Sequence, residues 1–151
     1  MVIVTSLGAI VATVALPARA ADAEPVLHSY AGDGVIPFGD ASTYGALDTT
    51  LSSAVTGMAA TPDGQGYWLV GADGGVFAFG DATFYGSLGA LRLYGPIVAI
   101  TSTPDGKGYW LTALDGGVFA FGDAAFYGSM GGTALARPIV GMALTPDGKG
   151  Y

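Results

Sequence analysis

The chain has 151 residues, of which 51% are hydrophobic and 11% are charged, so it holds enough apolar material for one folded domain. Acidic residues outnumber basic ones by 12 to 5, and the net charge of −7 argues against binding to nucleic acid or to an anionic membrane surface. No cysteine is present, which excludes disulfides and thiolate metal sites. The 26 glycines and 8 prolines recur at regular places, a pattern typical of a β protein with many tight turns.

The N-terminal stretch differs in character from the rest. Val2–Leu16 is an apolar run, and Ala18–Ala20 has the small-x-small pattern that signal peptidase recognises. We therefore expect a signal peptide at residues 1–20 and a secreted or cell-surface protein, although no Lys or Arg precedes the run. A membrane anchor is the alternative, but the run is short for a membrane span. Residues 21–31 are interpreted as a leader into the fold.

The remainder of the chain is built from copies of one unit. Thr61–Gly89 returns almost unchanged as Thr103–Gly131, and a third TPDG begins at Thr145, with a constant spacing of 42 residues. A degenerate upstream copy survives in Gly34–Gly45. Residues 32–151 are therefore predicted to hold a half copy, two full copies and a truncated half copy.

Each full copy is predicted to form four short antiparallel strands. In the second full copy these are Ile97–Ser102, Tyr109–Thr112, Val118–Phe121 and a short strand at Phe126-Tyr127. Asp115-Gly116-Gly117 is expected to form a primed hairpin turn before the third strand. The TPDG turns combine a proline, whose φ is fixed, with a glycine that tolerates positive φ. Their structural residues are Pro62, Asp63, Gly64, Pro104, Asp105, Gly106, Pro146, Asp147 and Gly148.

Both faces of these strands are apolar, which favours sheets that stack face to face. Along Tyr67–Val70, alternate side chains point to opposite faces and none of them is charged. A four-stranded unit with a period of 42 residues matches the blade of a β-propeller. The expected fold is all-β, an incomplete β-propeller built from 42-residue four-stranded blades. A β-solenoid is the alternative, but its coils usually have shorter periods.

The unit TPDGxGYWLVxxDGGVFAFGDAxFYGS resembles a tandem repeat of secreted proteins from high-GC Gram-positive bacteria, and the resemblance covers Gly34–Tyr151. That repeat is usually interpreted as propeller-like and is often attached to cell-wall hydrolases or other exported enzymes. The resemblance implies a surface or extracellular binding module and names no target. This chain departs from the pattern because Pro37 lies in the third strand of its first copy, its last copy stops at Tyr151 and no catalytic domain is attached.

The number of copies is small for a propeller, since four to eight blades usually close a ring. We favour the interpretation that the chain is a fragment of a longer repeat protein. The other hypothesis is that two chains pair into a closed ring, each supplying strands that the other lacks. Open blade edges and apolar blade faces are also expected to promote self-association.

Residues with the pattern of a catalytic site are scarce. Ser87 and Ser129 lack the first glycine of the G-x-S-x-G elbow, and His28 is the only histidine. Nine of the twelve acidic residues fall at three repeated turn positions, which favours turn capping over a single active site. Calcium binding by these turns is disfavoured, because the spacing of a calcium loop is missing. We expect no catalytic activity, no metal and no cofactor.

Binding residues are expected in Leu88–Gly95 and Met130–Arg137, where the copies differ most and which lie on the face of the Asp-Gly-Gly turns. Strand aromatics such as Trp68 and Trp110 more often form the core than stack on sugars. The predicted function is a secreted or cell-surface, non-catalytic binding module for a cell-wall glycan or a surface protein. The alternative is the targeting portion of an exported cell-wall or polysaccharide hydrolase. The candidate ligand-binding residues are Asp73, Arg92, Tyr94, Asp115 and Arg137.

Overall fold

The computed structural model describes residues 2–4, 10–12, 35–47 and 51–151, and every regular element in these ranges is a β-strand. The prediction of an all-β fold is therefore confirmed, while the expected leader at residues 21–31 lies outside the described residues. The strands are β1 (Val2–Val4), β2 (Ile10–Ala12), β3 (Val35–Pro37), β4 (Val55–Ala60), β5 (Gly66–Gly71), β6 (Val76–Gly80), β7 (Ile97–Ser102), β8 (Gly108–Ala113) and β9 (Val118–Gly122).

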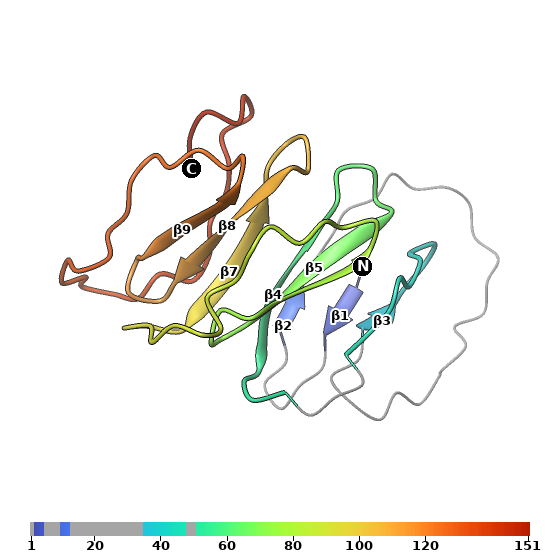
Figure 1. Ribbon diagram of the computed structural model, residues 1–151, viewed down its shortest axis with the longest axis horizontal. Coiled ribbons are helices and arrows are strands. Elements are labelled where there is room, and N and C mark those ends of the chain that lie inside the picture. The colour runs from blue at the N-terminus through green and yellow to red at the C-terminus, as the bar shows by residue number, and fades with distance from the viewer. Residues whose placement is uncertain (1, 5–9, 13–34, 48–50) are drawn as a thin grey trace.

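The strands form antiparallel sheets of three strands each, with the orders β2-β1-β3, β4-β5-β6 and β7-β8-β9. The sheets follow one another through the molecule in the order of the chain (Figure 1). The second and third sheets share one register at an offset of 42 residues, because Trp68 pairs with Ala78 and Trp110 pairs with Ala120. A bulge near the start of β4 recurs near the start of β7.

The predicted fourth strand of each copy is wrong. Neither Phe84-Tyr85 nor Phe126-Tyr127 belongs to a strand, so each full copy forms three strands. The residue before each aromatic pair accepts a hydrogen bond from a tryptophan indole, in place of the backbone hydrogen bonds of a β-sheet. The Nε1 group of Trp68 donates a hydrogen bond to the carbonyl of Thr83 at 2.8 Å, and Trp110 makes the same bond in the next copy.

The turn between the second and third strands is also not the primed turn expected from Asp115-Gly116-Gly117. A primed turn of that kind needs positive φ at both of its central residues. Only Gly116 has it, with φ of 84°, and no residue other than glycine has positive φ among the described residues. The carboxylate of Asp115 accepts the N–H of Gly117 at 3.0 Å, so the side chain and the left-handed glycine together close a longer loop.

The middle strands carry the core because both of their faces are covered. Sheets lie on both faces of β5, whereas β8 packs against the second sheet on one face and against Met142 and Tyr151 on the other. Every residue of β5 and of β8 is buried. Trp68 faces the third sheet, where its ring centroid lies 5.6 Å from that of Tyr109. Tyr67 and Leu69 point the opposite way and pack in a cluster with Val35 of β3. The alternating apolar pattern therefore joins the second sheet to both of its neighbours.

One tyrosine per copy links its sheet to the preceding copy by hydrogen bonds. The hydroxyl of Tyr109 donates to the carbonyl of Gly86 at 2.6 Å and accepts the N–H of Tyr85 at 3.2 Å. In return, the hydroxyl of Tyr85 donates to the carbonyl of Gly106 at 3.1 Å. Burial raises the pKa of Tyr109 above its ordinary value, which keeps its hydroxyl protonated and able to donate.

The same contact recurs along the chain. The hydroxyl of Tyr151 donates to the carbonyl of Gly128 at 2.6 Å and accepts the N–H of Tyr127 at 3.1 Å. The hydroxyl of Tyr67 donates to the carbonyl of Gly45. Each tyrosine hydroxyl therefore donates a hydrogen bond to a glycine carbonyl of the copy before it, and we call this contact the tyrosine junction.

Removal of the hydroxyl tests how much the tyrosine junction stabilises the fold. Tyr109→Phe leaves the carbonyl of Gly86 and the N–H of Tyr85 without this partner, and we expect a loss of about 1–3 kcal/mol in the free energy of unfolding. Tyr94→Phe is the control, because Tyr94 is fully exposed and should change stability by less than about 0.5 kcal/mol. Equal losses in urea unfolding would contradict the role of the junction.

The close approach at Gly86 gives a second test with a matched control. Gly86 and Gly128 both have φ of 136°, so alanine meets similar backbone strain at either position. A Cβ at Gly86 would lie 2.7 Å from Cδ1 of Phe121, whereas a Cβ at Gly128 would meet nothing within 4 Å. We expect Gly86→Ala to cost about 1–3 kcal/mol more than Gly128→Ala in urea unfolding, because only the former overpacks a ring. Similar costs for the two variants would contradict this close packing.

Candidate functional site

A hollow of about 850 Å³ opens beside β8 and β9, at the end of the third sheet where β8 turns into β9. Loop residues 91–95 and 131–134 form its walls, and Val118 and Phe119 of β9 contribute to its lining. We call it the β8–β9 hollow. The walls come from the two segments in which the copies differ most.

Three of the five candidate binding residues line the β8–β9 hollow, namely Arg92, Tyr94 and Asp115. The side chain of Tyr94 is fully exposed, Arg92 is exposed and Asp115 is half-buried. Asp73 occupies the corresponding turn of the second sheet, where its carboxylate accepts a hydrogen bond from Ser52 at 3.3 Å. Neither Asp73 nor Arg137 is among the lining residues.

Close backbone contact shapes one wall of the hollow. A Cβ at Gly116 would lie 2.7 Å from Cβ of Met130, and a Cβ at Gly131 would lie 3.1 Å from Cα of Gly117. The N–H of Met130 donates to the carbonyl of Gly116 at 2.9 Å. The loop therefore lies flat on the turn because glycines leave room for it.

Ser129 and Phe119 are lining residues that the sequence did not indicate as part of a site. The hydroxyl of Ser129 donates to the carbonyl of Gly116 at 3.2 Å and accepts the N–H of Gly131 at 3.0 Å, so it fixes the loop. Phe119 has the pattern of a core residue and is half-buried here. Its exposed part depends on which segment covers β9, a property that local sequence does not encode.

The side chains around the β8–β9 hollow suit a neutral, hydroxyl-rich ligand. An exposed phenol ring offers a flat apolar surface for stacking. A guanidinium and a carboxylate offer donors and acceptors in the same lining, next to apolar residues. This combination can bind and orient a ligand, and it includes no nucleophile with a neighbouring base.

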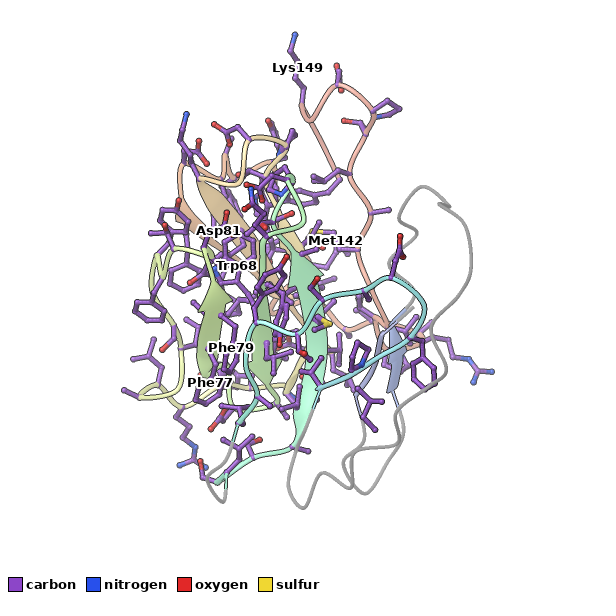
Figure 2. The ribbon with its side chains drawn as sticks, turned by 90° about the vertical axis from the view of Figure 1, so that its right-hand side faces the viewer. Trp68, Phe77, Phe79, Asp81, Met142 and Lys149 are labelled. Carbon is purple, nitrogen blue, oxygen red and sulfur yellow. The ribbon has the colours of Figure 1, made fainter. Side chains whose placement is uncertain are left out.

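Two smaller grooves of about 190 and 200 Å³ lie between successive TPDG turns. Asp81 lines the first groove, and Figure 2 shows that it lies nearer than Phe77 to the end of the molecule that carries Lys149. Asp63 and Asp105 line the same groove. Within the described part of the chain, no group of three or more acidic or histidine side chains is arranged to hold a metal ion.

The aspartate of each TPDG turn caps the turn. Asp105 accepts hydrogen bonds from the hydroxyl of Thr103 at 3.0 Å and from the backbone N–H of Lys107 at 3.3 Å. The ammonium of Lys107 lies 3.2 Å from the same carboxylate. These contacts, led by the backbone N–H of Lys107, lower the pKa of Asp105. The pKa values of Asp63 and Asp147 are lowered in the same way by hydrogen bonds within their turns.

The lowered pKa of Asp105 predicts a pH dependence of stability. A depressed folded-state pKa stabilises the fold above the unfolded-state value, which is ordinarily 3.8, and this contribution is lost as the pH falls through the folded-state value. We therefore expect the difference in melting temperature between the wild type and Asp105→Ala to be largest near about pH 6 and to shrink below about pH 4. Thermal unfolding followed by circular dichroism measures it. A difference that stays constant across this range would contradict the capping role of the ionised carboxylate.

Comparison with known proteins adds no relative: no protein-family model matches the chain, and no curated protein matches it significantly. Among the described residues, no helix is long and apolar enough to cross a membrane.

Proposed function

We propose that the protein is a secreted or cell-surface binding module without catalytic activity, and that the β8–β9 hollow is its binding site. The observation that carries this proposal is the fully exposed ring of Tyr94 beside Arg92 and Asp115. Trp68 and Trp110 are almost completely buried, whereas Phe84 and Phe126 are also exposed but do not line the hollow. An aromatic ring that stays exposed to water does not stabilise the fold, and such a ring in a hollow is typical of a recognition surface.

A cell-wall glycan is the ligand class that these side chains support best. Sugar rings present one apolar face that can stack on the ring of Tyr94, while their hydroxyls both donate and accept hydrogen bonds. Arg92 supplies donors and Asp115 supplies acceptors in the same lining. The net charge of −7 disfavours a polyanionic ligand. A surface protein is the second partner class, because the hollow is open and its lining is largely apolar.

The proposed architecture is an incomplete β-propeller with three strands per described copy. Antiparallel hairpins within each copy support it over a solenoid, since the strands of a parallel β-helix run in parallel. Face-to-face packing of successive sheets through the tyrosine junction supports it as well. Export by a signal peptide at residues 1–20 belongs to the same proposal.

The resemblance of the repeat unit to arrays attached to cell-wall hydrolases favours a second candidate function. In that case the chain is the targeting portion of an exported cell-wall or polysaccharide hydrolase, and the β8–β9 hollow directs it to the substrate. Both candidates use the same binding site. They differ in whether an enzyme is delivered, so the binding experiment below applies to both.

Sedimentation with insoluble peptidoglycan tests the proposed site. We expect the wild type to bind and the triple variant Arg92→Ala, Tyr94→Ala, Asp115→Ala to bind at least about tenfold more weakly, a loss of about 1.4 kcal/mol. The control is Asp73→Ala with Arg137→Ala, because both residues lie outside the hollow and should leave the affinity unchanged. Equal losses in the two variants would place the site elsewhere, and no binding by the wild type would overturn the glycan proposal.

A further inference from the structure

The Asp-Gly-Gly turn occurs in both full copies, and its aspartate makes the same capping hydrogen bond in each. The Oδ1 atom of Asp73 accepts the N–H of Gly75 at 3.0 Å, and Oδ1 of Asp115 accepts the N–H of Gly117 at the same distance. Both aspartates are half-buried. The two turns therefore hold their carboxylates alike, and they differ only in what reaches the second oxygen, Oδ2.

The second oxygen of Asp73 is bonded within the chain. The hydroxyl of Ser52 donates a hydrogen bond to Oδ2 of Asp73 at 3.3 Å. Ser52 lies in the loop that leads into β4, two residues before Ala54, whose carbonyl accepts the N–H of Ala72 at 2.9 Å. The loop of this copy therefore supplies an alcohol group to the aspartate of its own turn.

The corresponding loop of the next copy supplies no such hydroxyl. Tyr94 stands 42 residues after Ser52, and it is likewise two residues before Pro96, whose carbonyl accepts the N–H of Leu114 at 2.8 Å. The side chain of Tyr94 is fully exposed. In the part of the chain that the structure describes, no hydrogen bond reaches Oδ2 of Asp115, and Asp115 lines the β8–β9 hollow.

The loop still approaches the turn closely in this copy. A Cβ at Gly95, the residue after Tyr94, would lie 3.2 Å from Cγ of Asp115. The carboxylate therefore lies against the loop that carries Arg92 and Tyr94. Because Asp115 and loop residues 91–95 line one hollow, a ligand bound by the loop also meets the carboxylate.

We propose that Oδ2 of Asp115 accepts a hydrogen bond from a sugar hydroxyl in the β8–β9 hollow, as Oδ2 of Asp73 accepts one from Ser52. This inference rests on the proposed function and narrows its ligand class. A carboxylate accepts hydrogen bonds and donates none. It therefore selects a sugar unit that presents a hydroxyl there, and it disfavours a carboxylate or phosphate group of the ligand at the same place. Tyrosine in place of serine turns a self-bonded turn into a ligand-binding one.

Asparagine substitution tests the assignment while the turn keeps its cap. In Asp115→Asn the amide oxygen can still accept the N–H of Gly117, but an NH2 group replaces the second acceptor. We expect Asp115→Asn to bind insoluble peptidoglycan at least about tenfold more weakly than the wild type, because a hydrogen bond to a charged group is lost. Asp73→Asn is the matched control, since Asp73 lies outside the hollow, and it should bind within about twofold of the wild type. Urea unfolding of both variants separates lost binding from lost folding.

Transfer of the serine to the next copy provides a second variant. Tyr94→Ser and Tyr94→Ala both lack the ring, but only the serine can donate a hydroxyl to Asp115 as Ser52 does to Asp73. This hydroxyl competes with the ligand for Oδ2, so we expect Tyr94→Ser to bind peptidoglycan at least about threefold more weakly than Tyr94→Ala. When Asp115→Asn is added to each, the two variants should bind alike.

The possible outcomes distinguish this assignment from the proposed function. No binding by the wild type would overturn both. Wild-type binding that Asp115→Asn leaves unchanged, or that Asp115→Asn and Asp73→Asn weaken equally, would overturn the assignment of Oδ2 alone. Equal binding by Tyr94→Ser and Tyr94→Ala would also overturn that assignment.

Discussion

The structure depends on one phenol per copy that forms hydrogen bonds with the backbone of the copy before it. Tyr109 meets this constraint with the backbone of Gly86 and Tyr85. The phenylalanine beside it then packs directly on the glycine, which leaves no room for a side chain there. The hydrogen bonds of the phenol and the close packing of the phenylalanine therefore act at the same place. Together they determine the position of each sheet relative to the preceding copy.

The two ends of the stacked sheets differ in how their side chains are used. At the TPDG end, each turn satisfies its own polar groups, and the carboxylates of Asp63, Asp105 and Asp147 are engaged in capping. At the opposite end, the loops are held by backbone contacts with glycine and by the side chains of Asp115 and Ser129, and other loop side chains remain exposed. The exposed Tyr94 and Arg92 stand on such a loop. A rigid stack with variable loops at one end is a common basis for recognition.

Local pattern predicted the strands well because alternation and β-branching act within a few residues, and Ile97–Ser102 is strand β7 as expected. The stretch Phe126-Tyr127 misled because its aromatics serve contacts between sheets, which a local pattern does not distinguish from a strand. The turn type at Asp115 was predicted wrongly because the carboxylate of Asp115 accepts the N–H of Gly117, so the loop closes with one left-handed glycine instead of two. Divergence between copies did indicate two loops of the β8–β9 hollow, but the contribution of Phe119 depends on tertiary packing alone.

The identical spacing of the tyrosine junctions has a consequence for how such a chain can change in length. Gain or loss of one complete 42-residue unit leaves every phenol opposite the backbone it binds. An insertion of one residue within a strand would shift the phenol to the wrong carbonyl and turn the following side chains to the wrong face. Variation in this array should therefore come in whole modules, with smaller changes confined to the loops around Tyr94 and Thr133.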